Sequence, residues 1–244
     1  MTHLGDKRVL LIGAGGLGSP VATLLARAGV GHLEVVDEDT IDRSNLQRQT
    51  LYASVDVGAA KSVVAAGRIR DEARAAGHLA TKAVAREMRV YPDSALAVVQ
   101  GFDLVVEGSD NHPTKFLIAD ACALAGVACV QAGAVRWVGW ALGSVPGRSA
   151  CLRCVFEDVP EGPDQGCSVA GVLGPVVGVI GALQAAIALQ LLHDETSAAG
   201  VLHHYEALAG SLRRTRVARR ADCPLCTGAI TGIDAVRYMP HRAA

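Results

Sequence analysis

A glycine-rich turn near the N-terminus is the first feature of the chain that could do chemistry. Gly13, Gly15 and Gly18 match the pattern G-x-G-x-x-G, directly after an apolar run over residues 8–12. The backbone of such a turn can approach a phosphate chain, and the N-terminus of the following helix favours negative charge. Asp37 follows Gly18 by 19 residues, after a second apolar run, where a carboxylate can hold ribose hydroxyls. The pattern indicates a nucleotide site but fits NAD, FAD and ATP equally.

A densely polar segment, residues 37–49, comes next and favours ATP over a dinucleotide as the ligand. A dehydrogenase would normally continue there into another helix, whereas this segment supplies Asn45 and Arg48, and Lys61 follows it. Arg48 and Lys61 could neutralise a triphosphate, which carries more charge than the pyrophosphate of a dinucleotide. The alternative is a solvated polar loop followed by an exposed lysine on a helix.

A carboxylate stands where a third apolar run, residues 103–107, ends. Asp110 lies just beyond this run, and ligands of open α/β sheets bind beyond the carboxyl ends of strands. An acid that faces a triphosphate suggests a magnesium ligand. The alternative is an N-cap for a helix that begins near Pro113.

Four of the seven cysteines form two C-x-x-C pairs: Cys151 with Cys154, and Cys223 with Cys226. Paired knuckles of this kind are typical of a tetrahedral four-cysteine zinc site, which would be structural because no coordination position stays open. The 68 residues between Cys154 and Cys223 exceed the usual zinc-ribbon spacing. The alternative is a thioredoxin-like redox pair.

The other three cysteines divide into one candidate nucleophile and two core residues. Cys167 follows a polar loop and precedes a long apolar segment, and a cysteine at a helix N-terminus can have a lowered pKa and act as a nucleophile. The alternative is an incidental or packing cysteine. Cys122 and Cys129 lie in an apolar helix and strand and are predicted to be buried.

Alternating strands and helices must position these residues. The hydrophobic pattern predicts strands over residues 8–12, 32–36, 79–85, 103–107, 127–131 and 139–145, with helices over 19–28, 59–76 and 113–125. This order predicts an α/β fold: a Rossmann-like, doubly wound, mostly parallel sheet. Strand-like runs at 203–208 and 212–217 predict a C-terminal antiparallel extension. We expect residues 1–150 to bind the nucleotide and 151–244 to add the zinc knuckles, a loop, a buried helix and the last strands, in one compact domain.

The composition of the 244 residues excludes several other classes of protein. Half of the residues are hydrophobic, and 23 Lys and Arg balance 24 Asp and Glu, so no global field attracts nucleic acid or a membrane surface. The first residues contain no apolar signal segment, which predicts a cytoplasmic protein with free thiols.

Residues 168–192 contain no charge and are long enough to span a bilayer. Four glycines, Pro175, Gln184 and Gln190 interrupt this segment. These residues favour a closely packed interior helix over a helix that faces lipid.

Taken together, five motifs in order resemble the ThiF/MoeB/HesA group, the bacterial relatives of ubiquitin-activating enzymes. The motifs are residues 13–18, Asp37 with Asp39, residues 44–49, Lys61, and residues 109–111, and the resemblance runs from about residue 8 to 226. The resemblance implies that the chain uses ATP to adenylate the C-terminal glycine carboxylate of a small ubiquitin-like sulfur carrier ending in Gly-Gly. Pyrophosphate would be released, and the enzyme would be a homodimer.

The resemblance also implies roles for individual residues. Arg48, Lys61 and Asp110 would act in catalysis, with Asp110 binding Mg²⁺, and Cys167 would take up the activated carboxyl or exchange sulfur. The family commonly carries the paired cysteines, which would hold Zn²⁺ between the end of the sheet and the C-terminal region. ATP would be held by Gly13, Gly15, Gly16, Asp37, Asp39, Ser44, Asn45, Gln47, Arg48, Lys61, Asp110 and Asn111.

The chain departs from the family pattern at both ends. Relatives usually begin with a helix whose arginine reaches the ATP of the partner subunit, whereas only residues 1–7 precede the first predicted strand here. No rhodanese-like extension follows Cys226, so any sulfur donor would be a separate protein. Two alternatives therefore stay open: adenylation of a peptide in natural-product biosynthesis, and a catalytically weak dimer partner or scaffold that binds nucleotide.

Overall fold

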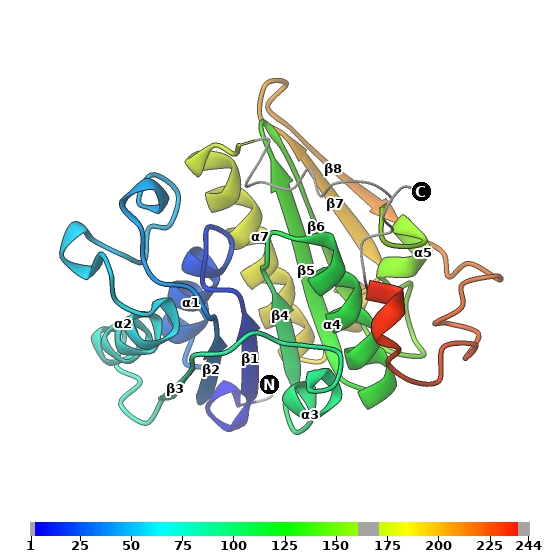
Figure 1. Cartoon of the computed structure of the whole chain (residues 1–244), viewed down its shortest axis with the longest axis horizontal. Coiled ribbons are helices and arrows are strands. Elements are labelled where there is room, and N and C mark those ends of the chain that lie inside the picture. The colour runs from blue at the N-terminus through cyan, green and yellow to red at the C-terminus, as the bar shows by residue number, and fades with distance from the viewer. Residues whose placement is uncertain (1–2, 161–170, 239–244) are drawn as a thin grey trace.

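One eight-stranded sheet organises residues 3–160 and 171–238, which the computed structural model describes (Figure 1). The strand order is β3-β2-β1-β4-β5-β6-β7-β8. The strands are β1 (Arg8–Ile12), β2 (His32–Val36), β3 (Lys82–Arg86), β4 (Leu104–Glu107), β5 (Ala128–Val135), β6 (Val138–Ser144), β7 (Val201–Glu206) and β8 (Ser211–Arg216). The helices are α1 (Gly18–Arg27), α2 (Lys61–Ala75), α3 (Ala95–Val99), α4 (His112–Ala125), α5 (Leu152–Phe156) and α7 (Gly174–Leu192). Short 3-10 turns lie at Leu4–Asp6, Arg43–Asn45, Ser54–Asp56, Thr196–Ala198 and Ala235–Tyr238.

The sheet has a parallel half and an antiparallel half. Strands β3, β2, β1, β4 and β5 are parallel, whereas β6, β7 and β8 continue the sheet as an antiparallel meander. Ile12 at the end of β1 pairs with Val36 on one side and Glu107 on the other. The carboxyl ends of β1, β2 and β4 therefore lie at one edge of the sheet. The predicted doubly wound sheet with an antiparallel extension is confirmed.

Helices cover both faces of the sheet, as the alternation of side chains along β1 requires. Val9 and Leu11 enter the core cluster that includes α1, α2 and α7, whereas Leu10 and Ile12 enter the cluster that includes α3 and α4. Figure 1 shows α4 on one face and α7 on the other. A parallel strand buried on both faces reads as a continuous apolar run, which is the pattern of residues 9–12.

The α7 helix covers part of the uncharged segment. Its first residue is Gly174, and Val172 forms a β-bridge with Arg136; residues 168–170 lie outside the described part of the chain. Within the described residues, α7 is the one helix long and apolar enough to cross a membrane, and 56% of its most apolar window is buried inside the protein. Close packing explains a glycine in this helix: a Cβ on Gly181 would lie 2.7 Å from the carbonyl oxygen of Leu17 in the turn before α1.

Two strands differ from their predicted bounds by three residues or more at one end, whereas the other strands match to within two residues. The third strand begins at Lys82 rather than residue 79, because Gly77 has a positive φ and residues 79–80 form a turn. The fifth runs to Val135 rather than 131, because β5 pairs along nearly its whole length with β6 in a hairpin. Gly133 interrupts the apolar pattern there because the indole of Trp140 covers it: a Cβ would lie 2.6 Å from the ring nitrogen.

Candidate active site

A cavity of about 1060 Å³ opens at the carboxyl ends of β1, β2 and β4. Ligands of open α/β sheets bind at such a point, where neighbouring strands connect in opposite directions. The walls combine backbone from the glycine turn with carboxylates, the three cationic residues Arg48, Lys61 and Arg89, and several apolar side chains. The lining residues include Gly13, Gly15, Gly16, Asp37, Asp39, Asn45, Arg48, Gln49, Lys61, Asp110 and Asn111.

Backbone geometry explains the glycines of the turn. Gly13 has a φ of +85°, and a Cβ on it would lie 3.0 Å from the backbone of Gly108 at the end of β4. A Cβ on Gly18 would clash with the carbonyl oxygen of Gly13. The turn is therefore tight enough to bring backbone amides to the cavity, and α1 begins at Gly18 with its positive dipole end there.

Asp37 connects the second strand to the glycine turn. One carboxylate oxygen accepts the backbone N–H of Ala14 at 2.7 Å, and the other accepts that of Asp39 at 2.9 Å. Burial raises the pKa of Asp37, while these two N–H donors and Lys61 oppose the shift. Tyr52 supports the same region, because its hydroxyl donates to the carbonyl oxygen of Ala14 at 2.8 Å.

The two predicted cations lie at the cavity in different surroundings. The Lys61 side chain is buried at the first turn of α2, and its ammonium contacts the Asp39 carboxylate at 2.7 Å. Arg48 is partly buried and donates to the carbonyl oxygen of Ser44 at 3.4 Å. Among the described residues, Asp39 is the one acid that pairs with Lys61, and because that carboxylate is mostly exposed, the Lys61 ammonium can also bind an anionic ligand. The alternative of an exposed helix lysine is excluded by the burial of Lys61.

The motif at residues 44–49 contributes three residues to the cavity. Asn45, Arg48 and Gln49 line it, whereas Ser44 and Gln47 are exposed and are not among the described lining residues. The backbone of Gln47 instead packs against Gly174, where a Cβ would lie 2.5 Å from the Gln47 carbonyl oxygen. The ligand roles of Ser44 and Gln47 stay predictions.

Sequence reasoning missed Gln49, which is 4% exposed and whose Oε1 has no hydrogen-bond partner among the described residues. Gln49 belongs to the motif at residues 44–49, but the motif does not show that its side chain points into the cavity. Other lining residues that the motifs did not indicate are Thr40, Met88, Arg89, Thr114, Val159 and Tyr238.

Asp110 and Asn111 have separate roles at the end of β4. The Asp110 side chain is exposed at the cavity, whereas Asn111 caps α4 by accepting the N–H of Thr114 at 2.9 Å. The helix cap predicted as the alternative role of Asp110 is therefore supplied by Asn111. An exposed carboxylate beyond the carboxyl end of a strand, in the same cavity as Arg48 and Lys61, is suited to an oxygen-preferring divalent ion such as Mg²⁺.

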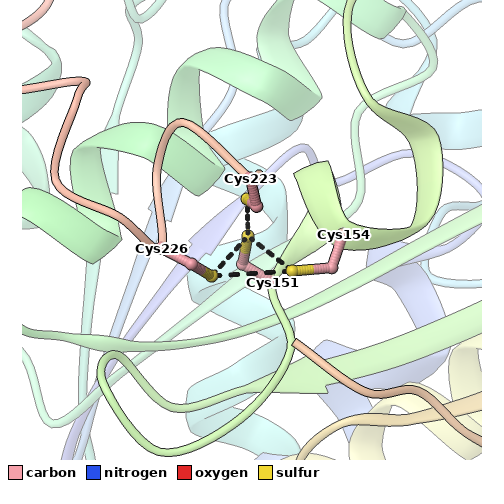
Figure 2. A group of neighbouring side chains, drawn as sticks. All are labelled: Cys151, Cys154, Cys223 and Cys226. Carbon is pink, nitrogen blue, oxygen red and sulfur yellow. Dashed lines mark hydrogen bonds between the residues drawn. The ribbon is translucent and has the colours of Figure 1, made fainter. Parts of the chain in front are cut away.

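The four paired cysteines meet in space. Figure 2 shows their sulfur atoms converging from the start of α5 and from the loop after β8, and all four lie within 4.8 Å of one another. The Sγ of Cys151 lies 3.8 Å from that of Cys154 and 3.6 Å from those of Cys223 and Cys226. Four ligands at the usual Zn–S distance in a tetrahedron are separated by about 3.8 Å, so the donor set fits zinc. Burial and the neighbouring thiols raise the pKa of Cys151, an effect that a bound cation would reverse.

The predictions for the other three cysteines are confirmed for two of them and untested for the third. Cys122 and Cys129 are each 1% exposed, which confirms that they are core residues. Cys167 lies outside the described residues, so its role stays a prediction.

Comparison with known proteins identifies the family. The model of the ThiF family matches residues 1–225. The chain belongs to the ThiF family. The SAMP-activating enzyme E1 of Haloferax volcanii is 38% identical over 240 residues, covering 97% of this chain and 87% of the relative. The sulfur carrier protein adenylyltransferase of Thermus thermophilus is 38% identical over 243 residues, covering 97% and 88%. This ThiF-family chain is thus an adenylyltransferase, as the motifs predicted.

Solved structures agree on the fold. E. coli MccB in complex with MccA-N7isoASN superimposes with a TM-score of 0.79, covering 91% of this chain and 67% of that one. The two sequences are 22% identical, so this likeness shows the fold alone.

Proposed function

We propose that this ThiF-family enzyme uses ATP to adenylate the C-terminal glycine carboxylate of a ubiquitin-like sulfur-carrier protein. The observation that carries the proposal is the single cavity that joins the glycine turn, Arg48, Lys61 and Asp110. This combination suits a triphosphate with its metal better than a dinucleotide. The names of the Haloferax and Thermus relatives support a carrier protein as the acceptor.

The chemistry is attack by a carboxylate oxygen of the carrier on the α-phosphorus of ATP. The bond from that phosphorus to the oxygen bridging to the β-phosphate breaks, and pyrophosphate leaves. Such a reaction depends on positioning and on stabilisation of charge on the phosphate oxygens. The backbone amides at Gly15 and Gly16 would hold the phosphates, Asp37 the ribose, and Asn45, Arg48 and Lys61 the charged oxygens. Bound Mg²⁺ would neutralise triphosphate charge, and Asp110 would supply its protein ligand.

Several features outside this cavity belong to the proposal as well. Zinc on the four cysteines would be structural, since four thiolates leave no open coordination position. We also propose a cytoplasmic homodimer that receives sulfur from a separate donor, and a later transfer step that uses Cys167. Neither nucleic acid nor a membrane is proposed as a partner.

The deciding experiment is ATP–pyrophosphate exchange with Mg²⁺ and a ubiquitin-like carrier that ends in Gly-Gly. The same carrier without its last glycine is the substrate control, and we expect exchange only with the intact tail. Asp110→Ala should abolish exchange, whereas Asp71→Ala, which removes an exposed acid from α2, should leave it unchanged.

Each alternative predicts a different result in the same assay. Exchange with a short peptide and not with the carrier would favour peptide adenylation. Nucleotide binding without exchange for any acceptor would favour a scaffold. Full activity in Asp110→Ala would refute the metal assignment.

A further inference from the structure

A buried ion pair lies directly behind the candidate metal ligand. The Lys115 ammonium on α4 contacts Oε2 of Glu107, the last residue of β4, at 3.0 Å. The two side chains are 7% and 0% exposed. Lys115 also donates to the carbonyl oxygen of Ser109 at 2.7 Å and to that of Ala132 on β5 at 2.5 Å. Three acceptors thus surround the three N–H groups of one ammonium.

The other oxygen of Glu107 completes a clamp on Ser109. Glu107 Oε1 accepts the backbone N–H of Ser109 at 2.7 Å and also the Ser109 hydroxyl. Ser109 is therefore held at its N–H and its hydroxyl by Glu107, and at its carbonyl by Lys115. The next residue is Asp110.

Energetics argue that this pair does more than fill the core. Burying two charges costs several kcal/mol of desolvation, and well-packed apolar residues in such a place are often as stable or more so. Lys115 does not line the cavity that the described residues form, and Glu107 neutralises it, so it is not a phosphate-binding cation. What the pair does supply is a fixed backbone at the residue before Asp110.

We propose that Lys115 and Glu107 are positioning residues that hold the Asp110 carboxylate where it binds the metal of the ATP complex. This inference rests on the proposed function of Asp110. The pair acts through Ser109 and does not touch substrate. Residues that orient a metal ligand from behind typically change metal affinity or activity by about 10–100-fold when they are removed.

The test compares how pyrophosphate exchange depends on Mg²⁺ concentration in two variants, each with a substitution at a buried residue. Lys115→Met removes the contact to the Ser109 carbonyl oxygen and leaves Glu107, which holds the other two Ser109 groups, without its buried cation. Gln131→Met is the matched control, because buried Gln131 donates to the carbonyl oxygen of Lys115 at 2.8 Å and makes no hydrogen bond to Ser109 among the described residues. We expect Lys115→Met to raise the Mg²⁺ concentration for half-maximal pyrophosphate exchange by at least about tenfold. Gln131→Met should leave that concentration within about twofold of the wild type, since it removes no contact to the metal-ligand loop.

A double variant separates positioning from stability. Glu107→Leu with Lys115→Met replaces both charges by apolar side chains and should recover much of the melting temperature that Lys115→Met loses. It should not restore the wild-type Mg²⁺ concentration for half-maximal exchange, because Ser109 still lacks its contacts to Glu107 and Lys115. Recovery of both properties would overturn the proposal, as would equal Mg²⁺ shifts in Lys115→Met and Gln131→Met.

Binding measurements distinguish failure of this inference from failure of the proposed function. The increase in melting temperature with ATP can be compared with and without Mg²⁺, in the absence of any carrier. A wild type that shows Mg²⁺-enhanced ATP binding but no exchange would refute carrier adenylation, and the variants would still test the clamp by binding. A wild type on which Mg²⁺ has no effect would overturn both.

Discussion

The largest single-residue effect on stability is expected at Asp120, which binds an arginine located between two of the four clustered cysteines. Arg153 separates Cys151 from Cys154, and its Nε and Nη2 donate to the Asp120 carboxylate at 2.9 and 3.0 Å. The Tyr238 hydroxyl donates to the same carboxylate at 2.8 Å. Arg153 is 1% exposed and Asp120 is 0% exposed.

Asp120→Ala would leave a buried guanidinium without its main partner and Tyr238 without an acceptor. Removal of one member of a buried, hydrogen-bonded pair costs about 3–5 kcal/mol of unfolding free energy. For a chain of this size each kcal/mol lowers the melting temperature by about 2–4 °C, so the expected decrease is roughly 6–20 °C.

Asp158→Ala is the matched control for this measurement. Asp158 contacts the same guanidinium at 2.9 Å, but its side chain is 62% exposed. An exposed pair contributes at most about 1 kcal/mol, so Asp158→Ala should lower the melting temperature by no more than about 4 °C. Thermal and urea unfolding of the two variants beside the wild type make the comparison. Equal losses in the two variants would refute the reasoning from burial.

Three further predictions follow from the cysteines, the helix contact and Asp37. Cys223→Ser should lower the zinc content measured by mass spectrometry, whereas Cys129→Ala, a buried core residue outside the four-cysteine cluster, should leave it unchanged. Gly181→Ala should cost about 1–3 kcal/mol in urea unfolding, because its Cβ meets Leu17 and Pro20. Gly178→Ala on the same helix, with nothing within 4 Å, should instead stabilise by up to about 1 kcal/mol. Burial raises the pKa of Asp37, so the native state binds its proton more tightly than the unfolded state does. Stability measured against pH should therefore fall as pH rises from the unfolded pKa of 3.8 toward the native value, and Asp37→Asn should flatten this slope.

Much of the site could be predicted because its requirements are local in the sequence. Gly13 and Gly18 are required by a turn whose close contacts leave no room for a Cβ. The alternation of apolar runs and helices gave the parallel half of the sheet, since each strand buried on both faces reads as a continuous apolar run. The C-x-x-C pairs indicated a metal site although 68 residues separate them, because the pairing itself follows from zinc geometry.

The sequence could not predict which side chains of the polar segment point into the cavity. The motif at residues 44–49 contains Gln47 and Gln49, which the sequence does not distinguish. Gln49 lies beyond the 3-10 turn over Arg43–Asn45 and is buried at the cavity, whereas the backbone of Gln47 packs against Gly174 on α7. The length of β5 is a similar case, because Gly133 breaks its apolar pattern and only pairing with β6 extends the strand.

The family, the glycine turn and the paired cysteines can be recognised from the sequence, because each depends on a few residues at short, characteristic spacing. The two buried ion pairs next to these features become visible in the folded chain. Lys115 is 8 residues from Glu107 and Arg153 is 33 residues from Asp120. A charged residue in a sequence ordinarily indicates a solvent-exposed position. Its burial follows from the partners that the fold brings to it, and no local pattern encodes those partners.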